Sequence, residues 1–196
     1  FLVQRRDKDM WVQKGISMVE GIVSQADVLS RQYDFCIANP PYMGSGSMNP
    51  LLKIFIKSNF DKAAGDLATS FVLRNIKFVH SNGIISMITF QNWMFVGTFA
   101  QFRKAVLRDS NIALFVHNGR GVWGSDFGSC SFCLTKPPLY KSQGIFIRLF
   151  DKNSSVQSNN ELIQKFHQRD SKREFLRKSE SFLKIPGNTL AYWVPD

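Results

Sequence analysis

The four residues Asn39-Pro40-Pro41-Tyr42 combine a side-chain amide, free carbonyl groups and an aromatic ring that together could do chemistry. Two consecutive prolines fix the backbone angle φ and remove two amide donors, so the segment is rigid and rich in hydrogen-bond acceptors. The Asn39 side-chain oxygen and the Pro40 carbonyl can each accept one hydrogen of an amino group, while Tyr42 stacks on the ring that carries it. The segment therefore predicts a slot for a planar molecule with an exocyclic amine.

This arrangement favours methyl transfer to an amine. An amine that donates both hydrogens moves toward sp3 character, and its lone pair becomes available to an incoming methyl group. The segment also follows a strand-like run, residues 33–38, and precedes Met43-Gly44-Ser45-Gly46. The alternative interpretation is an ordinary strand that ends in a Pro-Pro turn with an exposed tyrosine.

Alternating strands and helices are expected around this loop. Short apolar runs rich in β-branched residues predict strands, and apolar residues spaced by three and four predict helices. The expected strands are residues 16–23, 33–38, 84–90, 112–117, 131–135 and 145–150, with two helices within 50–80 and another at 99–107. The order indicates an α/β fold with a mainly parallel sheet, whose last two strands form an antiparallel hairpin at one edge. Open parallel sheets bind ligands at the carboxyl ends of their strands, where Asn39 is expected.

Composition divides the chain near residue 150. Residues 1–150 contain the expected strands and are interpreted as one catalytic domain. From Asp151 the sequence is rich in Ser, Asn and Gln, and a charged helix is expected from Glu161 to about Lys178. We expect residues 151–196 to be a linker and helix that lead away from the core.

Net charge indicates the class of partner. Lys and Arg number 25 against 15 Asp and Glu, which gives a formal charge of +10. Each neutralised phosphate releases counterions, so this surplus favours a nucleic acid, and its spread along the chain predicts a broad basic face. A basic protein without such a partner is the alternative.

Cysteine count and hydropathy indicate a cytoplasmic protein. Three cysteines do not make a disulfide framework, no signal-peptide pattern opens the sequence, and no apolar run approaches the roughly 20 residues that span a bilayer. The sequence opens on Phe1 and runs at once into mixed charges, which predicts a fragment of a longer chain.

The sequence resembles the DNA amino-methyltransferases whose motif is Asp/Asn/Ser-Pro-Pro-aromatic, and is most similar to the PglX-type adenine methyltransferases of BREX phage-resistance systems. The stretches that carry the resemblance are NPPYMGSGSM (39–48), DLATSFVLRNIKFV (66–79), NGIISMITFQNWMF (82–95), FRKAVL (102–107) and IPGNTLAYWV (185–194). It implies a Rossmann-like fold, S-adenosylmethionine as cofactor, double-stranded DNA as partner and a role in phage defence or restriction-modification. It also allows other defence-system proteins as partners, and implies that the cofactor half precedes this chain and a target-recognition region follows it.

The resemblance assigns roles to individual residues. Asn39, Pro40, Pro41 and Tyr42 match the catalytic target-base motif. Asp27, with the backbone amide of Val28, matches the acid that holds the cofactor's adenine, although an Asp that caps a helix is the alternative. Phe127 matches a second aromatic wall against the extruded base, with core packing as the alternative. No metal ligand is expected.

One departure from the family pattern limits this chain. The Asp/Glu-x-x-x-Gly-x-Gly turn that cradles the methionine part of the cofactor is absent, as is the acid that holds its ribose. We expect the isolated chain to bind S-adenosylmethionine poorly and to be inactive.

Other patterns are weaker. The run Gly119 to Gly124 matches a dinucleotide fingerprint, but no convincing helix follows it. The pair Cys130 and Cys133 has metal-like spacing but lies in an expected strand. Cytosine N4, RNA adenine and protein glutamine remain alternative targets of the same loop, and a non-catalytic DNA-binding or scaffolding subunit that retains the fold is the alternative of another class.

Overall fold

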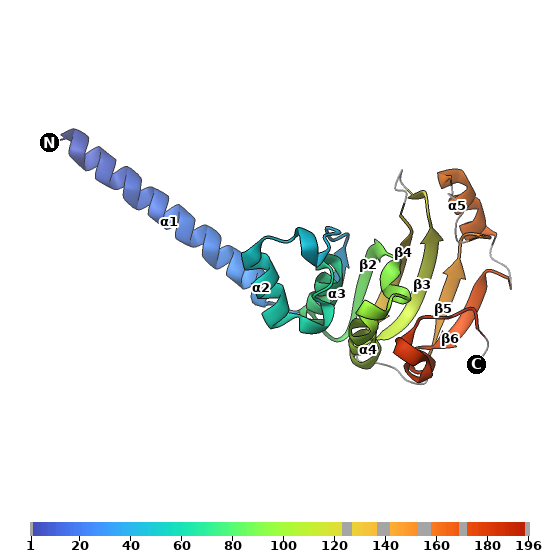
Figure 1. Ribbon diagram of the computed structural model, residues 1–196. Coiled ribbons are helices and arrows are strands. Elements are labelled where there is room, and N and C mark those ends of the chain that lie inside the picture. The colour runs from blue at the N-terminus through green and yellow to red at the C-terminus, as the bar shows by residue number, and fades with distance from the viewer. Residues whose placement is uncertain (1, 123–126, 137–141, 153–157, 169–171, 195–196) are drawn as a thin grey trace. The chain divides into compact units, whose positions relative to one another are not determined.

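The computed structural model describes residues 2–122, 127–136, 142–152, 158–168 and 172–194. It divides the chain into two compact units, Phe1–Gln32 and Tyr33–Asp196 (Figure 1). The first unit holds helix α1, Leu2–Ser30, and the second holds all strands of the described residues.

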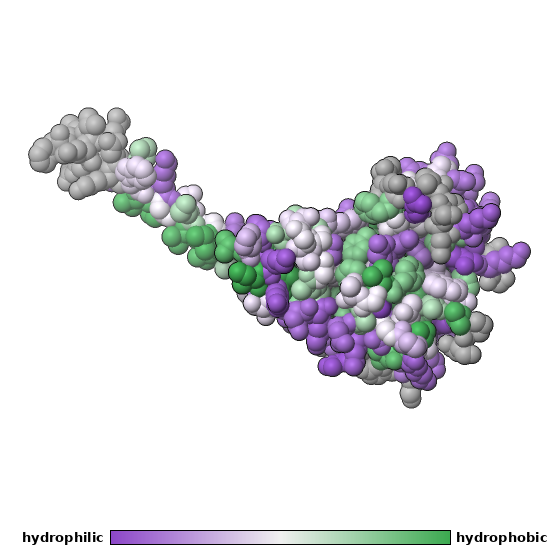
Figure 2. All heavy atoms as spheres, viewed as in Figure 1, coloured by the Kyte–Doolittle hydropathy of each residue, from purple (hydrophilic) through white to green (hydrophobic). Residues whose placement is uncertain are grey.

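Helix α1 corrects the strand expected at residues 16–23. Its side chains from Asp9 onward are exposed, among them the apolar Trp11, Met18 and Ile22. Figure 2 shows apolar side chains along this helix. A strand needs a neighbouring strand for its backbone hydrogen bonds, whereas a helix makes them within itself. The described part of this unit contains no second segment to pair with, so this β-branched run forms a helix.

Six strands of the second unit form one sheet in the order β1-β2-β4-β3-β5-β6. They are β1 (Tyr33–Ala38), β2 (Val79–Phe90), β3 (Asn111–Gly119), β4 (Ser129–Thr135), β5 (Gln143–Arg148) and β6 (Glu174–Lys178). β1 is parallel to β2, β4 is antiparallel to both β2 and β3, and β3 is parallel to β5. β1, β2, β3 and β5 therefore run in one direction, which confirms an α/β fold with a mainly parallel strand direction. Their carboxyl ends share one edge of the sheet.

The antiparallel pair at the far edge is β5 with β6, and not the hairpin expected from residues 131–135 and 145–150. These two segments are β4 and β5, and β3 lies between them. Val116 of β3 is aligned with Ser131 on one side and with Ile147 on the other. Two successive strand patterns do not reveal that an earlier segment is inserted between them, which is why this expectation was wrong.

The helices expected within 50–80 and at 99–107 are confirmed as α2 (Pro50–Asn59), α3 (Leu67–Phe78) and α4 (Ala100–Asp109). The side chains of Asn49 and Asp66 cap α2 and α3 by accepting hydrogen bonds from the first turn of each helix. Short 3-10 turns connect the elements: η1 (Ser45–Ser47), η2 (Asp61–Ala63), η3 (Asn92–Met94), η4 (Gly97–Phe99), η6 (Ser179–Lys184) and η7 (Pro186–Asn188). Among the described residues, no helix has the length and apolarity that crossing a membrane requires.

One face of the sheet carries the main core. α3, α4 and the strands bury aliphatic and aromatic side chains there, including Val72, Ile76, Ile85, Met87, Trp93, Phe102, Val106, Phe115, Phe132 and Phe146. On the other face, α5 (Asn159–His167) packs Leu162 with Val116 and Ile147. Burial of this apolar surface on both sides of β3 and β5 holds the carboxyl edge of these strands in a fixed place.

Residues beyond 150 belong to the same compact unit as the sheet, which corrects their interpretation as a linker away from the core. The single helix expected over 161–178 is wrong, because α5 ends at His167 and β6 follows it. Phe182, Leu190 and Tyr192 are fully buried in the main core. The polar composition of this segment hides these few apolar side chains, which are spaced too widely to form a periodic pattern. That the segment leads to a target-recognition region stays a prediction.

Candidate active site

The loop after β1 places the predicted catalytic residues at the carboxyl edge of the sheet. Asn39 and Pro41 are exposed, Pro40 is buried and Tyr42 is half-buried. The Tyr42 hydroxyl donates to the side-chain oxygen of Asn39 over 3.5 Å. A hydrogen bond of this length is weak, so the Asn39 amide is available to another partner.

Backbone hydrogen bonds fix this loop to the start of α3. The Leu67 N–H donates to the Met43 carbonyl at 2.9 Å, and the Ser45 N–H donates to the Gly65 carbonyl at 3.0 Å. Gly44 and Asp66 form an isolated antiparallel bridge between these two contacts. The chain on the carboxyl side of Tyr42 is therefore held by α3, and the chain on its amino side is held by β1.

A cavity of about 390 Å³ opens beside Tyr42. Four aromatic side chains line it: Tyr42, Phe90, Phe99 and Phe127. The Tyr42 ring lies edge-on to Phe127, with centroids 5.6 Å apart and planes at 70°, and edge-on to Phe90 at 5.9 Å. Phe127 is 51% exposed, so it stands at the rim rather than in the core. Aromatic rings on several sides suit a flat, partly apolar ligand.

Two polar side chains, Asp66 and Asn92, also line the cavity. Burial raises the pKa of Asp66, while the backbone N–H groups of Ala68 and Met43 oppose this by hydrogen bonding to it. Burial also raises the pKa of Tyr42, and the nearby Asp66 acts in the same direction. Tyr42 is thus a neutral phenol at neutral pH, which suits a stacking role better than a role as a base.

The structure brings two of the assigned segments together, whereas the third belongs to the other compact unit. Tyr42 and Phe127 line the same cavity, and Asn39 lies beside Tyr42. Asp27 and Val28 lie in α1, in the other compact unit, and not at the end of a strand. Asp27 forms an ion pair with Arg31 at 2.5 Å. A role for Asp27 and Val28 in cofactor binding stays a prediction.

Several cavity residues were not assigned from the sequence: Phe90, Asn92, Phe99 and Asp66. The sequence did contain a signal for two of these residues, Phe90 and Asn92. Phe90 ends the strand expected at 84–90, and Asn92 follows it, so both belong at the carboxyl edge by the same rule that places Asn39 there. Asp66 is also the N-cap of α3, which alone accounts for its position in the sequence. Phe99 carries no comparable signal.

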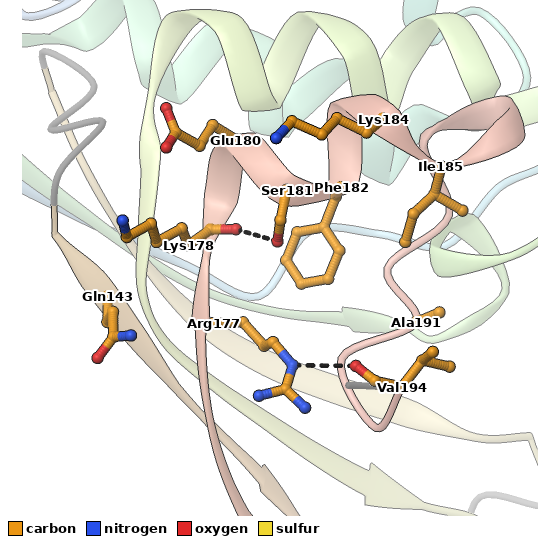
Figure 3. A pocket seen from close by; sticks show the side chains of 10 residues that line it. All are labelled: Gln143, Arg177, Lys178, Glu180, Ser181, Phe182, Lys184, Ile185, Ala191 and Val194. Atoms are coloured by element: carbon orange, nitrogen blue, oxygen red, sulfur yellow. Dashed lines mark hydrogen bonds between the residues drawn. The ribbon is translucent and has the colours of Figure 1, made fainter. Parts of the chain in front are cut away.

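A larger cavity, of about 550 Å³, lies at the opposite edge of the sheet. Gln143, at the amino end of β5, and Lys178, its neighbour on β6, mark this edge. Figure 3 shows the Arg177 side chain, whose Nε donates to the Val194 carbonyl at 3.2 Å, and the Ser181 hydroxyl, which donates to the Lys178 carbonyl. Because it faces away from the carboxyl ends, this cavity is not the candidate active site despite its size.

The two weaker patterns have structural explanations. Gly119 and Gly121 adopt left-handed φ values of 82° and 83°, and the rest of the glycine-rich run, from Trp123, lies outside the described residues. A side chain at position 119 would also meet the Phe150 ring at 2.7 Å. Cys130 is buried in the core with its sulfur 3.4 Å from the Thr89 hydroxyl, whereas Cys133 contacts Ser86.

Comparison with known proteins agrees with this geometry. The chain is 29% identical over 176 residues to Adenine-specific methyltransferase BrxX of Escherichia coli O9:H4 (strain HS), and 28% identical over 180 residues to Adenine-specific methyltransferase PglX of Lacticaseibacillus casei (strain Zhang). These matches cover 88% and 90% of this chain but 14% and 15% of the relatives, so the chain spans about one seventh of their length. The resemblance to PglX-type adenine methyltransferases is thereby confirmed.

The fold has solved counterparts. A type I restriction-modification methyltransferase subunit from Streptococcus thermophilus superposes with a TM-score of 0.57 at 17% identity, covering 81% of this chain and 37% of that one. At this identity the likeness shows the fold alone. The model of the Eco57I restriction-modification methylase family matches residues 3–123, which is more than half of the chain. The chain therefore belongs to the Eco57I restriction-modification methylase family.

Proposed function

We propose that the protein that contains this chain transfers a methyl group from S-adenosylmethionine to N6 of adenine in double-stranded DNA, in phage defence or restriction-modification. One observation carries the proposal: the exposed Asn39 lies next to a cavity whose aromatic wall includes Tyr42 and Phe127. Family membership and the two adenine-specific relatives support it. The match covers only 14% and 15% of these relatives, so their activity is carried over as a proposal.

The loop would activate the amine by accepting its hydrogens. The side-chain oxygen of Asn39 accepts a hydrogen bond from one N–H of the amine and the carbonyl of Pro40 accepts one from the other, which makes the nitrogen lone pair available to the methyl group. Neither acceptor has to move a proton before transfer, so the loop works through position and electrostatics. Rigidity of the Pro-Pro backbone keeps the two acceptors at a fixed separation.

The adenine must leave the DNA stack to reach this loop. Stacking on an aromatic ring compensates for part of the lost base stacking and contributes about 1–3 kcal/mol per base. Tyr42 and Phe127, whose rings contact each other where both line the cavity, provide the aromatic surface for this stacking. Asn92 and Asp66 provide polar groups for the edge of the base.

The cofactor supplies the methyl group when it is bound, and this chain offers only part of a site for it. Asp27 could accept from the adenine amine of S-adenosylmethionine, but its carboxylate lies on the exposed surface of α1 and pairs with Arg31.

The charge favours a nucleic acid as partner, and the family resemblance points to duplex DNA. A formal charge of +10 over 196 residues supports binding to phosphates, which positions the protein without reading sequence. Other defence-system proteins stay a prediction as partners.

Analysis of the methylated product tests the proposal. The complete protein is incubated with duplex DNA and isotopically labelled S-adenosylmethionine, and the DNA is digested to nucleosides and resolved by mass spectrometry. Labelled N6-methyladenine is the expected result. Label in N4-methylcytosine, in RNA or in protein glutamine would replace the proposed substrate, and DNA binding without any label would indicate a non-catalytic subunit.

A further inference from the structure

His117, at the carboxyl end of β3, is 2% exposed and hydrogen-bonded on both ring nitrogens. Its Nε2 lies 2.8 Å from the side-chain oxygen of Gln91, and its Nδ1 lies 2.9 Å from the Tyr192 hydroxyl. The amide oxygen of Gln91 can only accept, so Nε2 carries the proton. Nδ1 is then bare and accepts from the Tyr192 hydroxyl. The three side chains form one directed chain of hydrogen bonds, from Tyr192 through His117 to Gln91.

This chain of hydrogen bonds is a fixed structure and not a route for protons. Burial, with a contribution from the nearby Arg148, lowers the pKa of His117 to about 3, and burial raises the pKa of Tyr192. Both groups are therefore neutral across the range in which enzymes work. Networks of this kind hold side chains in place when every member has its partner.

Gln91, the last member of this hydrogen-bond network, contacts Gly128, the residue that follows Phe127. The Gln91 N–H donates to the Gly128 carbonyl at 2.9 Å. A Cβ atom at position 128 would fall 2.1 Å from the Gln91 side-chain amide, so Gln91 packs directly on the backbone of Gly128. Phe127 is the preceding residue, and its ring contacts Tyr42 where both line the cavity.

We propose that Gln91, His117 and Tyr192 are positioning residues that hold Phe127 as the second wall of the target-base pocket. The inference rests on the proposed function, because it names what keeps that pocket in shape. Tyr192 would then help to shape the pocket, although it lies more than 60 residues after Phe127 in the sequence. Without Gln91 as acceptor, His117 keeps a buried, unpaired N–H, and the side chain packed on Gly128 is no longer held by a hydrogen bond.

The variant Gln91→Leu removes the acceptor and keeps the approximate size of the side chain, whereas Gln91→Glu keeps an acceptor. Each is made in the complete protein beside Gln164→Leu, which makes the same change at an exposed position of α5. The substrate is a duplex in which 2-aminopurine replaces the adenine that the parent protein methylates, because its fluorescence rises when it leaves the stack. KM for unmodified DNA and kcat are measured in parallel, and Asn39→Ala is included.

With Gln91→Leu we expect KM for DNA to rise about tenfold, as for the partial loss of one base–aromatic stack, and the 2-aminopurine signal to fall. Gln91→Glu should restore both, and Gln164→Leu should match the parent. A residue that only supports the fold would lower the active fraction, and thus kcat, without changing KM or the signal per active molecule.

If Asn39→Ala abolishes transfer while Gln91→Leu retains the KM and the fluorescence of the parent, the positioning role is wrong and the proposed function stands. If the parent protein methylates no DNA and produces no rise in fluorescence, both are wrong.

Discussion

The α1 unit and the sheet unit contain the two sets of residues assigned to the reaction, and they differ in what holds those residues. Asn39 and Tyr42 lie in a loop tied to α3 by backbone hydrogen bonds and backed by a buried aromatic core. Asp27 lies on a helix whose described side chains are all exposed, with Arg31 as its ion-pair partner. The structure supports the roles of Asn39 and Tyr42, because contacts within their own unit hold them in place. The role of Asp27 would depend on contacts from outside its unit.

The largest stability effect should come from Arg103, which ties the C-terminal segment to the cavity side of the sheet unit. Its guanidinium is 1% exposed and donates to the carbonyls of Trp93, Val96 and Gly187 at 2.6–2.9 Å. Arg103→Ala removes all of these hydrogen bonds and leaves the buried Trp93 carbonyl unpaired, and we expect the free energy of unfolding to fall by about 3 kcal/mol. Urea denaturation of this chain measures it.

Arg108→Ala is the matched control, because Arg108 is an exposed arginine on the same helix, α4. We expect a change within about 0.5 kcal/mol. Equal effects of the two substitutions would show that the buried hydrogen bonds of Arg103 do not hold the sheet unit together.

The same contrast explains what the sequence could and could not predict. The strand at 33–38, the helices within 50–80 and the role of the loop at Asn39 depend on local patterns, and the structure agrees with the elements. Phe182 and Tyr192 enter the core from a polar segment, and β3 is inserted between β4 and β5. These features depend on contacts between distant segments, which no local pattern reports. Helix α1 was missed because β-branched residues favour strands only where a partner strand exists.

A smaller effect is expected in the pH dependence of stability, and it too comes from the sheet unit. Burial lowers the pKa of His117 from an ordinary 6.5 to about 3. Between these values the unfolded chain binds a proton that the folded chain excludes. The stabilisation is therefore complete above pH 6.5 and is lost as the pH falls toward 3. Between pH 6 and pH 5 the parent should lose about 1 kcal/mol more than His117→Gln.

Denaturation curves at pH 5, 6 and 7 for both proteins measure this difference. Parallel pH profiles for the parent and His117→Gln would mean that His117 titrates in the folded protein much as it does in the unfolded chain.

The smallest effect should arise in the α1 unit. Arg31→Ala removes an exposed pair, with side chains 63% and 52% exposed for Arg31 and Asp27. Surface pairs at this spacing contribute about 0.3–0.5 kcal/mol to helix stability and less at high salt. We expect a slight loss of helical circular dichroism and an unchanged urea midpoint for the sheet unit. A shift of that midpoint comparable to the effect of Arg103→Ala would contradict the assignment of this ion pair to the stability of α1 alone.

The central claim, that the loop at Asn39 activates the target amine, is tested most directly by Asn39→Ala in the complete protein. Asn160→Ala, at an exposed position of α5, makes the same substitution away from the cavity. We predict that Asn39→Ala lowers kcat at least about 100-fold, as for loss of one hydrogen bond aimed at the reacting group. Its Kd for duplex DNA should stay within about twofold, because phosphate contacts dominate binding. Unchanged turnover, or equal losses of turnover and DNA affinity, would contradict the claim.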